Sequence, residues 1–134
     1  MNKWRIEFTE KYKSSPLSFW VHKHLDCDVW SQATQYDPVL PKVIPAKGFP
    51  TLVVDALGFE LEFSSIEEVY HFLDIVRQKN MPTSTQLSNK RGVTYGPNGH
   101  WLSRLPAKLK PWSKRENYIK TVEEGLAEFK LLYP

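Results

Sequence analysis

The chain of 134 residues lacks the features that mark several large classes of protein. It has one cysteine, Cys27, so neither an intramolecular disulfide nor a cysteine-based zinc cluster can form. No apolar run approaches the roughly 18 residues of a membrane-spanning helix, and no basic-then-apolar leader opens the chain. We therefore expect a cytoplasmic protein without a membrane partner. The length predicts one domain over residues 1–134.

Motifs of the common enzyme classes are also missing. Gly92, Gly96 and Gly99 lack the spacing of a phosphate-binding loop, and no serine lies in a Gly-x-Ser-x-Gly turn. The acidic residues after Asp55 are not followed by the lysine of a metal-dependent nuclease element. We therefore expect no cofactor. A binding protein is favoured over an enzyme, and a metal-dependent enzyme is the least favoured hypothesis.

Alternating apolar and polar residues predict several β-strands. The alternation over residues 3–9 indicates a half-buried strand, and a second alternation over residues 17–29 predicts another. Two β-rich runs at residues 51–55 and 59–63 surround Gly58, which is the spacing of a hairpin. These patterns predict a small antiparallel sheet of about four strands.

Helical periodicity predicts two helices, over about residues 66–79 and 113–132. A Ser-x-x-Glu capping box lies at the start of each: Ser65 with Glu68, and Ser113 with Glu116. Gly125 interrupts the second helix at a cost of about 1 kcal/mol relative to alanine, which predicts close packing there. The fold class is therefore α+β, with the sheet packed against two helices and with long Pro/Gly-rich loops.

Charge is distributed unevenly along the chain. Residues 51–74 hold six acidic residues and no Lys or Arg, whereas residues 77–115 hold nine basic residues and no acidic one. Phosphates bind clustered cations, and unpaired bases stack on flat side chains. The basic stretch therefore predicts binding of nucleic acid or another polyanion. The candidate contact residues are Arg91, Arg104, Lys108, Lys110, Lys114, Arg115, Trp101, Trp112 and His100.

Two of these cations stand where a helix disfavours positive charge. Lys114 and Arg115 lie in the first predicted turn of the last helix, where the helix dipole costs each cation about 0.3–1 kcal/mol. Some interaction should compensate that cost, and an anion bound at the helix start is one candidate. The alternative is that the cations are solvated surface charges, while Trp101 and Trp112 close the core beneath them.

Two further hypotheses come from other residues. His22, His24, Asp26 and Asp28 share one face of the predicted strand and are candidate metal ligands, although an alternating polar face is first of all a solvent face. Five tryptophans and six tyrosines supply anchors for a protein interface. A protein-interaction or adaptor domain, or a self-associating accessory protein that forms a homodimer, is therefore the alternative to polyanion binding.

Overall fold

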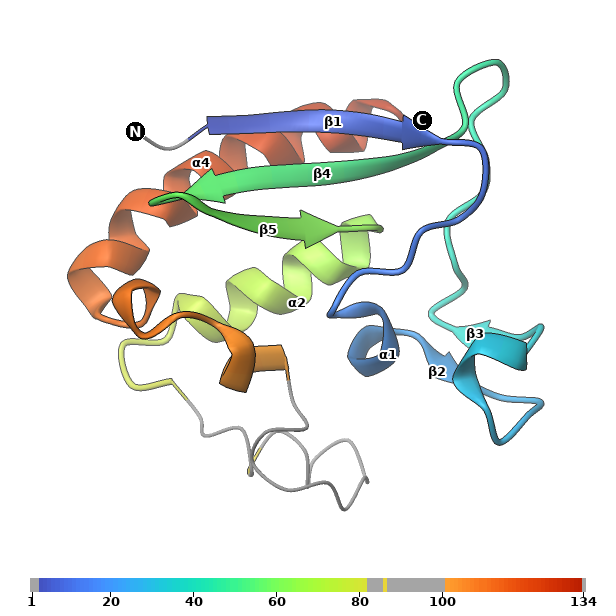
Figure 1. Cartoon of the computed structure of the whole chain (residues 1–134), viewed down its shortest axis with the longest axis horizontal. Helices are drawn as coiled ribbons and strands as arrows, with labels where there is room; N and C mark the ends of the chain where they lie inside the picture. Colours follow the sequence, from blue (N-terminus) through green and yellow to red (C-terminus); the bar gives the residue numbers. More distant parts are fainter. Residues whose placement is uncertain (1–2, 82–85, 87–100, 134) are drawn as a thin grey trace.

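Three antiparallel strands form the main sheet, in the order β1–β4–β5 (Figure 1). The computed structural model describes residues 3–81, 86 and 101–133. β1 (Lys3–Thr9) pairs with β4 (Phe49–Ala56), and β4 pairs with β5 (Phe59–Phe63). A two-residue turn joins β4 to β5, and Leu57 and Gly58 both have positive φ, as this turn type requires. The predicted first strand and hairpin are confirmed.

One face of the sheet carries the core. Alternate residues of the three strands point to it, so that Trp4 pairs with Val54 and Val54 with Leu61. Two helices cover this face: α2 (Ile66–Val76) and α4 (Trp112–Leu131), the latter running behind β1 and β4 in Figure 1. The α+β class predicted from the sequence is confirmed.

Gly125 marks the point where α4 comes closest to the sheet. A Cβ atom at this position would lie 2.8 Å from Leu52 Cδ1 and 3.3 Å from Trp4 Cβ. Both contacts are tighter than ordinary van der Waals distance, so the glycine allows the helix to pack on β1 and β4. The close packing predicted from the helix-weakening glycine is confirmed.

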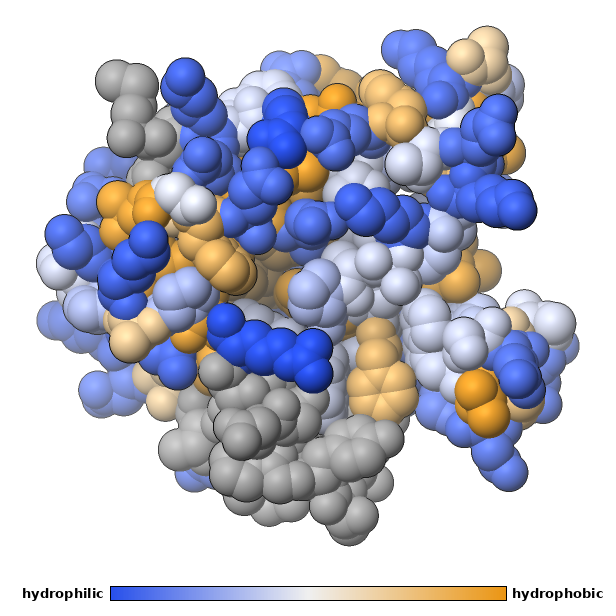
Figure 2. Space-filling view, viewed as in Figure 1, coloured by the Kyte–Doolittle hydropathy of each residue, from blue (hydrophilic) through white to orange (hydrophobic). Residues whose placement is uncertain are grey.

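The opposite face of the sheet is polar and carries ion pairs. Arg5 of β1 contacts Glu7 at 2.6 Å and Glu60 of β5 at 2.9 Å, and Lys13 contacts Glu62 at 3.0 Å. Figure 2 shows mostly hydrophilic side chains over β1 and β4. The acidic residues of the hairpin therefore serve an exposed, charged sheet face.

The predicted strand over residues 17–29 is wrong. This segment forms a short helix, α1 (Ser18–Val21), followed by the two-residue strand β2 (Lys23–His24), which pairs with β3 (Tyr36–Asp37). Leu17 and Trp20 are both buried and lie three residues apart, a helical spacing that the alternating pattern had masked. The short helix η1 (Trp30–Gln32) lies between β2 and β3, and we call residues 17–43 the small lobe.

The two main helices begin in different ways. Ser65 is the N-cap of α2, and its Oγ accepts a hydrogen bond from the Glu68 amide, so the predicted cap is confirmed. The Glu68 carboxylate reaches back to the backbone N–H of Ser64, one residue before the position that a capping box uses. The second is wrong, because α4 begins one residue earlier than predicted, Pro111 is its N-cap and no side chain caps it. Two 3-10 helices precede α4: η3 (Trp101–Arg104) and η4 (Ala107–Leu109). No helix in the described ranges is both long and apolar enough to cross a membrane.

Candidate functional site

Arg115 joins the start of α4 to the end of α2. The residue is 3% exposed, and its guanidinium donates four hydrogen bonds to backbone carbonyl oxygens. Nε donates to Lys110 O at 2.8 Å, Nη1 to Val76 O at 2.9 Å and also to Gln78 O, and Nη2 to Lys79 O at 2.9 Å. Four of the five N–H groups of an arginine are thus used inside the protein.

These contacts account for a cation in the first turn of α4. The carbonyl oxygens at the end of a helix lack intrahelical partners and carry the negative end of the helix dipole. Arg115 supplies donors and positive charge to the last carbonyls of α2 and to the residues just after it. The compensation expected for Arg115 therefore comes from α2, and its side chain builds this corner of the molecule.

Three lysines have backbone atoms at or next to this junction. The backbone carbonyls of Lys79 and Lys110 both bind the Arg115 guanidinium, and Lys114 precedes Arg115 in α4. Lys79 and Lys114 are exposed and Lys110 is half-buried. Within the described part of the chain, none of the three lysine side chains has an ion pair or hydrogen bond. We call Lys79, Lys110 and Lys114 the lysine corner.

Trp112 belongs to the same junction. It is half-buried, and the Arg115 guanidinium lies 5.0 Å from the centroid of its ring, within the range of a cation–π contact. The acidic residue nearest in sequence is Glu116, which is exposed. The backbones of three lysines thus lie at or next to the Arg115 guanidinium, and Glu116 is the carboxylate nearest to them in the sequence.

The other predicted contact residues lie elsewhere. Trp101 is 5% exposed, and its indole N–H donates to His71 Nε2 at 3.0 Å, so it belongs to the core. Lys108 Nζ donates to Leu57 O at 2.9 Å, which ties η4 to the hairpin turn. Arg104 is exposed at the end of η3. Arg91 and His100 lie outside the described residues.

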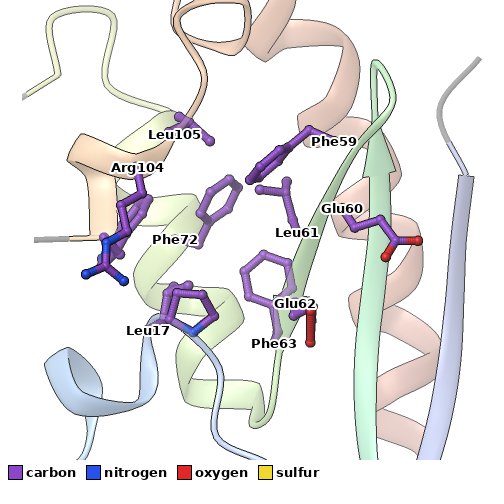
Figure 3. A pocket seen from close by; sticks show the side chains of 11 residues that line it. Leu17, Phe59, Glu60, Leu61, Glu62, Phe63, Phe72, Arg104 and Leu105 are labelled. Atoms are coloured by element: carbon purple, nitrogen blue, oxygen red, sulfur yellow. The ribbon is translucent and has the colours of Figure 1, made fainter.

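An apolar pocket opens beside β5. It has a volume of about 270 Å³ and lies between β5, α2 and η3. Figure 3 shows Phe59, Leu61 and Phe72 directed toward the same space. Glu60 and Glu62 turn toward the opposite face of the sheet, where they pair with Arg5 and Lys13. Arg104 is therefore the charged residue of the pocket lining whose side chain is not paired on the other face of the sheet.

A buried polar network fixes the start of α2. Glu68 is 0% exposed, and its carboxylate accepts hydrogen bonds from Ser64 N at 3.0 Å and from Ser18 Oγ at 2.9 Å. The hydroxyl groups of Ser15 and Ser65 also donate to it. These donors come from the start of α1 and the residues just before it, and from the residues at the cap of α2, so Glu68 binds the two segments together.

His22 completes this network and is fully buried. Its Nδ1 lies 2.7 Å from Pro38 O, and because a carbonyl oxygen only accepts, Nδ1 carries a hydrogen. Its Nε2 lies 2.8 Å from Ser65 Oγ and 3.4 Å from Glu68 Oε2. Burial lowers the pKa of His22, but the contacts with Glu68 and the Pro38 carbonyl outweigh it and raise the pKa above its ordinary value.

The trio of Ser65, His22 and Glu68 is not arranged for nucleophilic catalysis. All three residues are 0% exposed, so a substrate cannot reach the hydroxyl group. In a catalytic triad the carboxylate binds the imidazole nitrogen opposite the serine, whereas here Ser65 and Glu68 contact the same nitrogen. The trio holds α1, the Pro38 segment and α2 together.

The candidate metal ligands are not brought together. Both ring nitrogens of His22 have partners inside the protein, and the Asp26 carboxylate accepts hydrogen bonds from Thr34 and Gln35. These hydrogen bonds also lower the pKa of Asp26. Among the residues that the structure describes, no three His, Cys, Asp or Glu side chains could hold one metal ion.

The arrangement was compared with known proteins at the level of family, sequence and structure. No family model, curated protein or solved structure matches the chain.

Sequence reasoning considered His22 only as a metal ligand and missed its buried role, and it also missed Lys79 and the pocket. The Ser65–Glu68 spacing pointed to the start of α2, but nothing local shows that a histidine 43 residues earlier binds the same serine. Lys79 stood in the basic stretch without being singled out, because its neighbourhood with Lys110 depends on how α2 and α4 pack. The pocket residues carried the ordinary pattern of a hydrophobic core.

Proposed function

We propose that the protein is a non-enzymatic binding module for a polyanion, with nucleic acid as the foremost candidate. The observation that carries the proposal is the lysine corner: Lys79, Lys110 and Lys114 around the buried cation of Arg115. The Arg115 charge is held by carbonyl dipoles and the Trp112 ring rather than by a carboxylate, so it is not neutralised by an opposite charge. Clustered cations of this kind attract the phosphates of a nucleic acid backbone.

The roles within the corner differ. Lys79, Lys110 and Lys114 would contact phosphates, whereas Arg115 holds the corner together and adds its charge from below. Trp112 is half-buried and offers part of its ring to a base, as expected for single-stranded binding. The interaction would read the backbone rather than the base sequence, because no base-reading motif is present.

The test is a charge reversal with a matched control. The corner variant carries Lys79→Glu, Lys110→Glu and Lys114→Glu. The control carries the same change at three exposed lysines outside the corner: Lys11, Lys23 and Lys42. Both variants have the same net charge, so a difference between them reports the place of the charge.

Binding is measured by the fluorescence anisotropy of labelled single-stranded DNA and RNA at several salt concentrations. We expect wild type and control to bind at about 50 mM salt, and the corner variant to lose binding. Three phosphate contacts predict that the logarithm of affinity falls with the logarithm of salt with a slope of about −2. Absence of wild-type binding, or equal loss in both variants, would refute the proposal.

A protein partner is the second candidate function, and a separate observation favours it. The small lobe exposes four aliphatic side chains, at 61%, 48%, 71% and 51% for Leu25, Val29, Val39 and Val43. Figure 2 shows hydrophobic surface among hydrophilic side chains in this region. Sedimentation of the wild type and of a Leu25→Ser/Val39→Ser variant tests self-association; a concentration-independent monomer in both removes the homodimer.

A further inference from the structure

We propose that the pocket beside β5 binds a small carboxylate with a flat apolar body, separately from the lysine corner. The carboxylate would pair with Arg104 at the rim, and the body would fill the space between β5, α2 and η3.

The walls of the pocket are apolar and largely aromatic. Phe59, Phe63 and Phe72 line it together with Trp101, while Leu17 and Leu61 fill the gaps between the rings (Figure 3). The Phe63 and Phe72 rings meet edge to face at 5.2 Å, and Phe72 lies 5.5 Å from Trp101. Phe63 and Phe72 are fully buried and form the floor of the pocket, so the ring surface open to a flat apolar group is mainly that of the half-buried Phe59.

One charged group is available to orient such a ligand. Glu60 and Glu62 are among the lining residues, but their carboxylates pair with Arg5 and Lys13 on the other sheet face. Arg104 lines the pocket from η3, and within the described part of the chain its side chain has no hydrogen bond or ion pair. A guanidinium binds a carboxylate through two parallel hydrogen bonds, so the charge complementarity selects an anion of this type.

The volume limits the size of the ligand. Water takes about 30 Å³ per molecule in the liquid, so a cavity of about 270 Å³ holds on the order of nine atoms of that size. A phenyl ring with a two-carbon chain fits this space and leaves its carboxylate at the rim. We therefore choose 3-phenylpropanoate as the probe, and 3-phenylpropanamide as its neutral control of the same shape.

Binding is followed by NMR titration of the isotope-labelled full chain with each probe. We expect 3-phenylpropanoate to shift the resonances of Leu61, Phe63 and Phe72 saturably, and the amide to bind more weakly. Arg104→Gln should weaken the acid at least about tenfold and leave the amide unchanged. Arg77→Gln, which removes an exposed arginine outside the pocket, should change neither.

Two results would overturn the proposal. No saturable shift of the pocket resonances up to about 10 mM acid would exclude the site at any useful affinity. Equal binding of acid and amide, or equal loss in the Arg104 and Arg77 variants, would remove Arg104 as the group that recognises the ligand. Neither result depends on the lysine corner, so the two proposals fail independently.

Discussion

Replacing Arg115 by methionine removes the contact that joins α2 to α4 while keeping most of the side-chain volume. Each hydrogen bond from a charged group contributes about 1.5–3 kcal/mol when its partner is buried. Of the four carbonyl oxygens that accept these bonds, that of Val76 is buried. The other three, of Gln78, Lys79 and Lys110, are partly buried and regain water when the guanidinium is removed. We therefore expect a loss of about 3–5 kcal/mol in the free energy of unfolding.

Urea unfolding followed by circular dichroism measures this loss, because α2 and α4 supply most of the described helix. Lys114→Met is the matched control: it removes the neighbouring cation from an exposed position and should change the stability by less than about 0.5 kcal/mol. Arg115→Lys keeps the charge but has one nitrogen for four acceptors, so we expect an intermediate loss of roughly 2 kcal/mol. A loss below about 1 kcal/mol in Arg115→Met would refute the structural role of the guanidinium.

Two further predictions concern the packing and the buried network. Gly125→Val should destabilise the protein by about 1–3 kcal/mol, because the valine side chain would meet Leu52 and Trp4. The control Ala127→Val, on the exposed face of α4, should have a small effect. Similar losses of stability in the two variants would contradict the packing at Gly125. The raised pKa of His22, which faces Glu68 and Glu67 of α2, means that the native state binds the proton more tightly than the unfolded state. Its contribution is complete below about pH 6.5 and is lost as the pH rises through the native pKa, so the stability advantage of wild type over His22→Gln should shrink toward about pH 9. Urea unfolding across this range checks it, and an advantage that grows with pH would contradict it.

The elements that could be predicted from the sequence are those whose signal is local. β1 and the β4–β5 hairpin follow from alternation and a turn glycine, and α2 follows from its periodicity and its Ser65 cap. The prediction for the residues of α1 was wrong because their structure depends on a contact that is distant in the sequence. Their alternating pattern fitted a strand, but Ser18 is held by Glu68, 50 residues later in the chain.

The site shows the same division. The unfavourable dipole position of Arg115 was visible in the sequence and required a compensating partner. That the partner is the end of α2 depends on the packing of two helices, which no local pattern records. Trp101 was a candidate for base stacking because it lies among cations, yet it is buried in the core. Proximity in the sequence therefore identified the basic stretch that contains the lysine corner, but it could not assign the role of each residue in that stretch.

The most direct test of the polyanion proposal is an NMR titration of the wild-type protein with a short single-stranded oligonucleotide at low salt. We predict that the largest shifts map to Lys79, Lys110, Trp112 and Lys114, and that they disappear as salt is added. Shifts that map instead to the exposed aliphatic residues of the small lobe, or that are spread evenly over the chain, would contradict it.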